Sequence, residues 1–208
     1  SVIQSLTLGD ANFGLAGGSE NMSASPHIIK SNRWGKRMGN TTVEDMMLGA
    51  LNCPFGTGHM GVTAENVANE YNISREVQDS FSLESQRRAS SAIEKGYFKE
   101  QIVDIEIKKN IFNVDEHPKN TDLDSLKSLK SVFMEKGTVT AGNSSGLNDG
   151  AAALVLSTVP AAGSNGLKVK AKILGYSHSG VRPEVMGIGP IIAVKKLFEK
   201  TGLCEKDF

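Results

Sequence analysis

The sequence contains little of what marks several common classes of protein. Only Cys53 and Cys204 are cysteines among its 208 residues, which excludes a disulfide framework, and their spacing does not suit a metal site. The longest apolar runs, such as AAALVL at 151–156, are too short to span a membrane. Because so few cysteines fit a reducing compartment, we expect a cytoplasmic protein without a membrane or metal partner.

The sequence also has no excess of positive or negative charge. Lys plus Arg and Asp plus Glu both number 23, so the chain has no basic field that would attract nucleic acid. Hydrophobic residues make up 39% and charged residues 22%, which is typical of a soluble globular protein with a sizeable core. Residues 1–10 resemble the tail of a helix, and residues 193–208 resemble a helix and turn with nothing after them. We therefore expect the chain to be part of a longer one.

Apolar spacing and turn residues predict an α/β protein in which strands and helices alternate. Thr63 is expected to cap a helix that has Glu65 in its first turn. Gly17 and Gly18 are expected to stop a buried first strand, and residues 109–121 to form a polar loop. The predicted helices cover 1–8, 41–51, 63 onwards, 74–95 (with Val77 and Phe81 on an apolar face), 123–133 and 189–202. The predicted strands cover 11–18, 102–107, 151–157 (also buried) and 167–180.

A literal G-x-S-x-G, the string of a serine nucleophile elbow, occurs at 142–146. An elbow needs a helix directly after Ser144, whereas the Asn-Asp-Gly at 148–150 predicts a turn. The order serine, acid, histidine fails too, because the available acids either nearly adjoin Ser144 or follow His178. No Gly-Lys-Ser/Thr closes the glycine run, which excludes a Walker loop. The residues alone favour a tight connection whose glycines permit close backbone approach.

Several other residues give weaker signals. His59, flanked by glycines, is either a packed core residue or part of a ligand-facing loop. The basic segment Arg33–Arg37, with Trp34 inside it, is either a solvated loop or an oligomer contact. Cys53 is interpreted as a small buried hydrophobe, and Cys204 as an exposed, inert thiol.

Taken together, several segments resemble the thiolase family, and within it the short-chain acetoacetyl-CoA thiolases (acetyl-CoA acetyltransferases). LAGGSENMSASPH at 15–27 is similar to the family's AGGxExMSxxPh stretch. GHMGVTAENVANEYNISREVQDSFSLESQRRA at 58–89 is similar throughout to its HMGxTAENxA…SQ segment. DEHP at 115–118, GTVTAGNSSGLNDGAAALVL at 137–156 and VMGIGPIIAVKK at 185–196 also resemble family signatures. The resemblance covers essentially the whole chain and follows the family's order.

The resemblance implies a partial thiolase-like fold, a layered α/β/α/β/α core with an inserted α/β lid (loop) domain. Residues 1–21 and 148–166 would belong to the N-terminal half, 22–147 to the lid, and 167–208 to the start of the C-terminal half. The family's nucleophilic cysteine, GHP histidine and CxGGG cysteine would all lie outside this chain. No residue here, Cys53 and Cys204 included, therefore inherits a catalytic role.

The same motifs imply a binding site for coenzyme A (CoA). Ser145 would bond the pantetheine amide and Phe133 would pack against pantetheine. Lys119 is the nearest match to the arginine that follows DEHP in the family, and it offers a phosphate a point charge rather than a fork. The implied walls of the pantetheine and acyl pocket are Leu51, His59, Met60, Phe133, Ala141 and Ser145, with Met60 limiting the acyl length. Positions along the nucleotide end are Ser125, Leu126, Leu129 and Val132.

The implied reaction condenses two acetyl-CoA to acetoacetyl-CoA and CoA, or runs the reverse thiolysis, through a cysteine acyl-enzyme. CoA thioesters are the substrates, and no cofactor is implied. The intact protein would form a homodimer or homotetramer with Arg33–Arg37 as a suspected contact, while this chain alone is predicted to be inactive. The open alternative is a non-catalytic thiolase-like protein that binds CoA or lipid, or a truncated gene product.

Overall fold

The computed structural model describes residues 1–207, which fold into two compact units. The first unit comprises residues 1–47, 147–180 and 189–207, and the second comprises residues 48–146 and 181–188. Both units contain helices and strands, so the predicted α/β class is confirmed. Within the described residues, no helix combines the length and apolar character that a membrane crossing requires.

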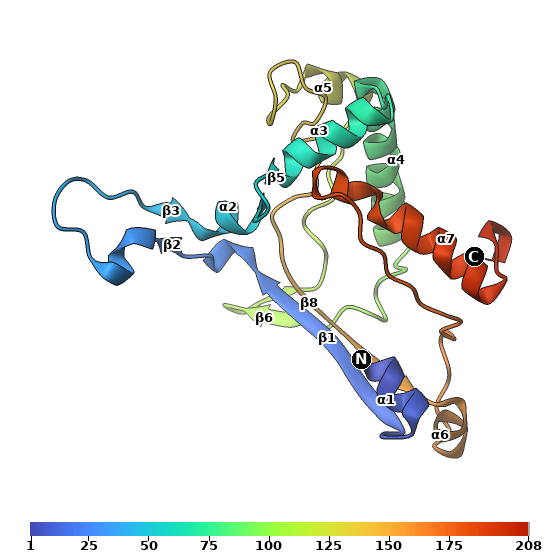
Figure 1. Ribbon diagram of the computed structural model, residues 1–208. Coiled ribbons are helices and arrows are strands. Elements are labelled where there is room, and N and C mark those ends of the chain that lie inside the picture. Colours follow the sequence, from blue (N-terminus) through green and yellow to red (C-terminus); the bar gives the residue numbers. More distant parts are fainter. Residues whose placement is uncertain (208) are drawn as a thin grey trace. The chain divides into compact units, whose positions relative to one another are not determined.

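The first unit contains a long antiparallel ribbon of two strands (Figure 1). β1 (Phe13–Asn21) pairs along its whole length with β8 (Asp149–Ser157). α1 (Val2–Leu8) precedes the ribbon and ends at Gly9, whose φ of 81° lies in the left-handed region that favours glycine. The other elements of this unit are the paired strands β2 (His27–Ile28) and β3 (Glu44–Asp45), α6 (Val159–Ser164), α7 (Gly189–Thr201), and the 3-10 helices η1 (Met22–Ala24), η2 (Lys30–Trp34) and η4 (Glu205–Asp207).

The ribbon corrects the prediction of two buried strands. β1 continues through Gly17 and Gly18, because pairing with β8 satisfies its backbone groups. A Cβ at Gly17 would lie 2.8 Å from the carbonyl oxygen of Ala152, so the close approach of the strands requires glycine there. Leu15 and Val155 keep 70% and 74% of their surface exposed. This exposure follows because, among the described residues, the sheet has only two strands and no layer buries its faces.

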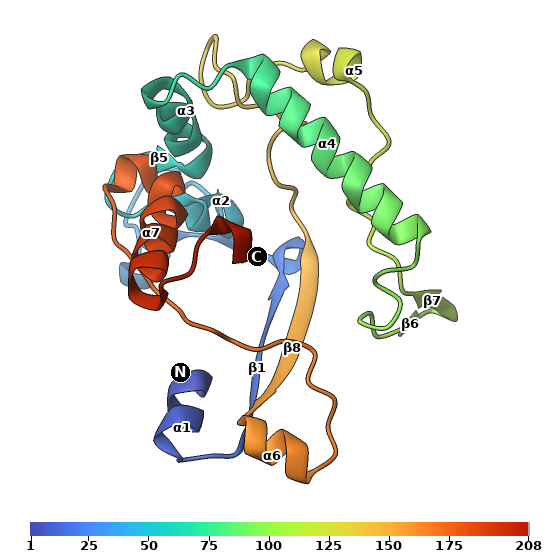
Figure 2. The ribbon, with the colours of Figure 1, turned by 90° about the vertical axis from the view of Figure 1, so that its right-hand side faces the viewer.

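The second unit contains helices and short hairpins (Figure 2). α3 (Met60–Glu70) packs against η3 (Pro183–Ile188), and the Asn66 side-chain amide donates to the backbone oxygen of Glu184 over 3.0 Å. α4 (Arg75–Glu94) follows after a short turn. The buried apolar side chains of this unit are Ala68, Leu126, Val139 and Val185. Its remaining elements are the hairpin of β4 (Asn52–Cys53) and β5 (Gly58–His59), the hairpin of β6 (Ile105–Ile107) and β7 (Asn110–Phe112), and α5 (Leu123–Ser128), while α2 (Met46–Ala50) is divided between the units.

Capping explains where the helices of the second unit begin. α3 starts at Met60 with His59 as its N-cap, so the prediction that Thr63 caps this helix is wrong. Thr63 lies inside the first turn, and its hydroxyl donates to the backbone oxygen of Met60. α4 begins after Ser74, as predicted, and Ser74 accepts from the N–H of Val77. Of the predicted apolar face of α4, Val77 and Phe81 are exposed, whereas Ala89, Ala92 and Ile93 are half-buried.

Three further predictions differ from the structure for local reasons. The predicted polar loop over 109–121 contains β7, because Lys108 and Lys109 have φ angles of 48° and 73° and turn the chain back from β6. The helix predicted over 123–133 ends at Ser128, since the next residue is extended. The helix predicted over 41–51 is reduced to α2.

Residues 167–180 were predicted to form a strand, but the structure assigns no strand to them. A strand needs a neighbour that accepts its backbone hydrogen bonds, and none of the described strands pairs with this segment. The helices predicted over 1–8 and 189–202 are confirmed as α1 and α7. The boundaries of the N-terminal half, lid and C-terminal half stay predictions.

Hydrogen bonds at one end of the β1–β8 ribbon should have a measurable effect on the pKa of Asp149. Ser23 donates its hydroxyl and its backbone N–H to the Asp149 carboxylate, and these bonds hold the pKa of Asp149 below its ordinary value of 3.8. We expect Ser23→Ala to raise the Asp149 pKa towards 3.8, because the strongest of these bonds is lost. An NMR titration of the Asp149 carboxyl measures the change.

The same bonds affect stability with a defined sign. Because the folded pKa of Asp149 is lowered, their contribution is present above pH 3.8 and is lost as the pH falls through the folded pKa. As the pH falls from 3.8 through the folded pKa of Asp149, the free energy of unfolding should decrease less in Ser23→Ala than in the wild type. Ser19→Ala, in the preceding strand β1, is the control. An Asp149 pKa that is the same in wild type and Ser23→Ala would contradict the prediction.

Candidate functional site

A buried carboxylate on α3 holds the start of the segment 138–146, called here the 138–146 loop. Glu65 is only 1% exposed. Its Oε1 accepts from the backbone N–H groups of Thr138 and Val139, both over 2.8 Å, and its Oε2 accepts from the Thr138 hydroxyl over 2.9 Å. A Cβ at Gly137 would lie 2.2 Å from Oε1, so the approach of the loop to this carboxylate requires glycine. Glu65 was predicted to lie in the first turn of the helix, but α3 begins at Met60, so Glu65 lies beyond that turn and bonds the loop.

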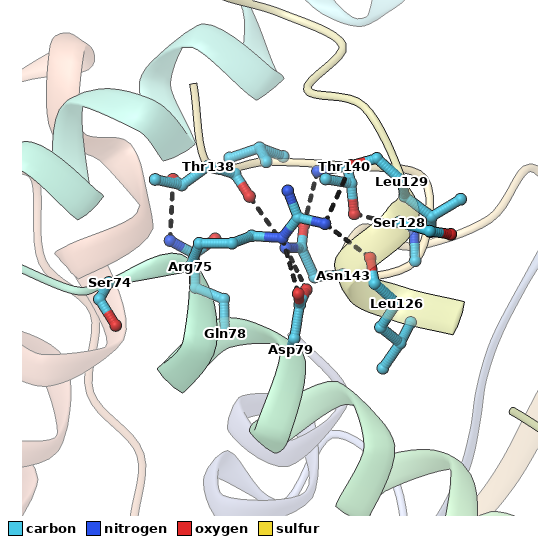
Figure 3. A network of polar contacts seen from close by, with 12 residues as sticks. Ser74, Arg75, Gln78, Asp79, Leu126, Ser128, Leu129, Thr138, Thr140 and Asn143 are labelled. Carbon is cyan, nitrogen blue, oxygen red and sulfur yellow. Dashed lines mark hydrogen bonds and ion pairs between the residues drawn. The ribbon is translucent and has the colours of Figure 1, made fainter. Parts of the chain in front are cut away.

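A second buried carboxylate, on α4, holds the middle of the loop (Figure 3). Asp79 is fully buried, and its Oδ1 accepts from the Asn143 side-chain amide over 3.1 Å. Asn143 closes the loop on itself, because its Oδ1 accepts from the N–H of Thr140 over 2.7 Å and its Nδ2 donates to the Thr138 oxygen. Gln78 adds a bond to the Thr138 hydroxyl over 2.9 Å. The loop thus has a defined shape without regular secondary structure.

Arg75 connects this arrangement to the end of α5. Its Nε donates to Asp79 Oδ2 over 2.7 Å, and one terminal nitrogen donates to the backbone oxygens of Leu126 and Leu129 over 2.6 and 3.0 Å (Figure 3). The two leucine side chains also contact the loop. A Cβ at Gly142 would lie 2.5 Å from Leu126 and 2.6 Å from Leu129. The end of α5 is therefore fixed against the loop by both polar and apolar contacts.

An aromatic stack lies at the start of α3. The rings of His59 and Phe133 are 4.7 Å apart at an interplanar angle of 20°. His59 Nδ1 accepts from the N–H of Gly61 over 3.0 Å, so the proton of the neutral ring is assigned to Nε2. A Cβ at Gly61 would lie 2.2 Å from Phe133. The half-buried His59 ring is packed and hydrogen-bonded, and its predicted contact with a ligand stays a prediction.

The predicted site residues fall into groups that the structure brings together. Phe133 contacts His59, and Met60 donates its N–H to the Leu51 oxygen over 2.9 Å. Val132 donates to the Val139 oxygen, so the segment before Phe133 runs beside the loop. A hollow of about 460 Å³, lined by Lys130–Lys136, lies at this segment.

The other predicted site residues are described by their exposure and by their backbone hydrogen bonds. Ala141 and Ser145 are exposed on the loop. Ser125 is exposed on α5, where the N-cap Asp122 accepts from its backbone N–H over 2.7 Å. Lys119 is exposed, and its N–H donates to Gln86 over 2.8 Å. Their contacts with a ligand stay predictions.

The surroundings of Ser144 lack the geometry that a nucleophilic serine needs. No helix follows the serine, and the chain instead enters β8 at Asp149. The predicted turn at 148–150 is in part the start of that strand. The Ser144 hydroxyl is buried and has no hydrogen-bond partner within the described residues, so no general base contacts it.

The two cysteines differ from each other in environment. Cys53 is half-buried, and the polar groups of the Thr57 side chain and the Phe55 backbone beside it lower the pKa of its thiol. Cys53 was interpreted as a small buried hydrophobe, and its partial exposure corrects that interpretation. Cys204 is exposed, as predicted. Among residues 1–207, no group of three or more His, Cys, Asp or Glu side chains could hold a metal ion.

Sequence reasoning missed the side chains that hold the loop. Asp79, Gln78 and Asn143 were not singled out, and Glu65 was given a different role. The spacing of Arg75 and Asp79, four residues apart on one helix, is the signal that could have indicated their ion pair. The sequence reasoning placed Phe81 on the apolar face of this helix, but Phe81 is exposed and the Asp79 carboxylate is fully buried. The sequence therefore did not indicate which side of the helix is buried.

Comparison with known proteins identifies the class. Residues 1–159 match the family model described as the N-terminal domain of thiolase. The beta-ketothiolase BktB of Cupriavidus necator is 50% identical over 213 residues, a match that covers 100% of this chain and 54% of the relative. The crystal structure of the Bacillus anthracis acetyl-CoA acetyltransferase matches with a TM-score of 0.92 at 43% identity, over 98% of this chain and 53% of that one. Human mitochondrial 3-ketoacyl-CoA thiolase, crystallised in complex with CoA, matches with a TM-score of 0.94 at 39% identity, over 99% of this chain and 52% of that one.

These matches define an α/β protein with part of a thiolase fold. The chain belongs to the thiolase family. It spans about half the length of the curated relatives that it matches.

The packing of Phe133 on α3 gives a prediction for stability. Gly61→Ala places a methyl group inside the Phe133 ring, so it should displace the ring, disrupt the stack with His59 and lower the free energy of unfolding by about 1–3 kcal/mol. Gly49→Ala in α2 is the matched control, because a Cβ there meets nothing within 4 Å. The control should be neutral or slightly stabilising, since alanine favours helix. Urea unfolding measures both, and equal free energies for the two variants would contradict the prediction.

Proposed function

We propose that this chain forms the CoA-binding part of a thiolase that condenses two acetyl-CoA to acetoacetyl-CoA and CoA, or runs the reverse thiolysis. The observation that carries the proposal is the 138–146 loop. The carboxylate on α3 holds its backbone, the carboxylate on α4 holds the Asn143 side chain, and Ala141 and Ser145 are exposed. Relatives named acetyl-CoA acetyltransferase, which match nearly the whole chain, support this choice of substrate.

The chemistry of pantetheine suits the residues near this loop. Pantetheine is a narrow chain of amides and methylenes, so its site needs apolar walls and a few placed hydrogen bonds. The ring of Phe133 and the side chain of Leu129, which is 37% exposed, supply apolar surface, and the exposed Ser145 supplies one hydroxyl. The hollow at 130–136 is lined by Phe133 and by the charged residues Lys130, Glu135 and Lys136.

The acyl transfer itself would use groups that this chain does not carry. In the proposed cycle a cysteine thiolate accepts acetyl from one acetyl-CoA and releases CoA. A base removes a proton from the methyl of a second acetyl-CoA, and the resulting carbanion attacks the acyl-enzyme to form acetoacetyl-CoA and regenerate the thiolate. Neither Cys53 nor Cys204 is proposed for these steps, so the 208-residue chain alone should be inactive.

We also propose that the protein is cytoplasmic and works as a homodimer or homotetramer. The segment Arg33–Arg37 is the proposed contact. It includes the end of η2, where Trp34 is 90% exposed, and Met38 directly after it is 90% exposed too. Large exposed apolar side chains next to several charges are typical of a surface that another subunit covers.

Ser145→Ala tests the proposed function directly. In the full-length protein, the wild type should cleave acetoacetyl-CoA with CoA, and the variant should show a KM for acetoacetyl-CoA raised by about threefold to tenfold, as expected for one lost hydrogen bond. Steady-state thiolysis kinetics measure the change.

Ser144→Ala is the matched control, one residue away. Its hydroxyl has no partner in the structure, so its removal should leave the KM unchanged. Loss of activity in Ser144→Ala but not in Ser145→Ala would instead favour a serine nucleophile. A wild-type protein that binds CoA without turning over thioesters would favour the non-catalytic alternative.

Met60→Ala tests the proposed limit on acyl length. Met60 begins α3 beside the ring of His59 and is 38% exposed. Shortening it should free space for additional methylenes, so the kcat/KM ratio of 3-ketohexanoyl-CoA to acetoacetyl-CoA should rise by about tenfold. Thiolysis rates with the two substrates measure this ratio. An unchanged ratio would show that Met60 does not limit the acyl chain.

A further inference from the structure

Among the described side chains, only Arg75 bonds both to the end of α5 and to Asp79, the carboxylate that holds the middle of the 138–146 loop (Figure 3). On one side its guanidinium donates to the backbone oxygens of Leu126 and Leu129. On the other it donates to Asp79, whose second oxygen accepts from Asn143 in the loop. A continuous series of hydrogen bonds therefore joins two segments that are about fifteen residues apart in sequence.

The chemistry of this series requires arginine. A guanidinium presents five N–H donors in a rigid plane, and here they serve one carboxylate and two carbonyl oxygens in different directions. Lysine keeps the charge, but its ammonium is compact and cannot reach the same three acceptors in that geometry. The Arg75 side chain is only 21% exposed and Asp79 is fully buried, so water cannot easily replace a lost bond.

The two segments matter because they contain the residues proposed for opposite ends of CoA. Ser125, Leu126, Leu129 and Val132 lie along the proposed nucleotide end, and Ala141 and Ser145 lie along the proposed pantetheine arm. CoA is a single molecule of limited length, so both ends bind well together only when the segments are held at the right separation. A protein that holds this separation before binding avoids the entropy cost of ordering it later.

We propose that Arg75 is a positioning residue that fixes the nucleotide-end segment relative to the pantetheine loop. This inference rests on the proposed function for the identity of the ligand, but the connection between the segments is independent of it. A residue that only stabilised the fold would affect all substrates alike. A positioning residue affects a substrate that uses both segments more than one that uses only the loop.

The test compares two thioesters in the full-length protein carrying Arg75→Lys. Acetoacetyl-CoA uses both segments, whereas acetoacetyl-pantetheine lacks the nucleotide end. We expect the KM for acetoacetyl-CoA to rise by about tenfold, which corresponds to about 1.4 kcal/mol, and the KM for acetoacetyl-pantetheine to change by less than about twofold. Equal increases for both substrates, or no increase for either, would overturn the proposal.

Arg88→Lys is the matched control. Arg88 lies on the same helix and pairs with Glu84 four residues away over 2.6 Å, but its side chain is 75% exposed and it bonds to neither segment. Its replacement should leave both KM values unchanged. Urea unfolding of both variants checks that each one folds.

Hydrogen–deuterium exchange of the unliganded protein provides a readout that does not depend on activity. Arg75→Lys should speed exchange in peptides that cover 126–130 and 138–143 together, and Arg88→Lys should not. If the wild type turns over neither thioester, the proposed function fails, and the exchange result alone decides whether Arg75 couples the segments. Unchanged exchange in either segment would overturn the coupling.

Discussion

The 138–146 loop depends on two carboxylates that are removed from water. A loop without regular secondary structure must find partners for its backbone N–H groups, and burial of a charge is costly unless donors surround it. Glu65 and Asp79 meet both requirements at once. Glu65 accepts the N–H groups of Thr138 and Val139, and Asp79 accepts the amide of Asn143, which in turn satisfies Thr140. Donors of the loop surround Glu65, Arg75 and Asn143 donate to Asp79, and these bonds give the loop one shape.

This arrangement explains why glycines occur so often where the loop meets its neighbours. Gly61 lies under the Phe133 ring, Gly142 under two leucines, and Gly146 under the ring of His117, whose Cε1 would lie 2.1 Å from an added Cβ. In each case the glycine makes space for a neighbouring side chain, and none of these three has a positive φ. The G-x-S-x-G string at 142–146 thus results from close packing, as the residues alone had favoured, and not from the backbone geometry of a nucleophile elbow.

Local patterns predicted the elements that local forces determine. α4 was predicted within a residue of its observed ends, because Ser74 caps it and Gly96 follows it. The prediction failed where partners distant in sequence decide the outcome. Residues 167–180 have the alternation of a strand but no described neighbour to pair with, and β1 passes through two glycines because β8 pairs with them. The candidate ligand contacts came from resemblance to a family, whereas the buried carboxylates could be seen only once α3, α4 and the loop were placed together.

The residues that support the loop and the residues proposed to contact the ligand lie on different kinds of element. The residues that hold the loop, Glu65 on α3 and Arg75 and Asp79 on α4, lie on helices, where neighbouring turns fix their backbone. Several residues proposed to contact the ligand, such as Ala141 and Ser145, lie on the loop and are exposed. Rigid elements that position an exposed loop are a common basis for binding sites, since the ordering cost is met on folding rather than on binding. Relatives named beta-ketothiolase and acetyl-CoA acetyltransferase both match this chain over its whole length or nearly so. A helical support of this kind lets exposed loop residues differ between relatives while the loop keeps its shape.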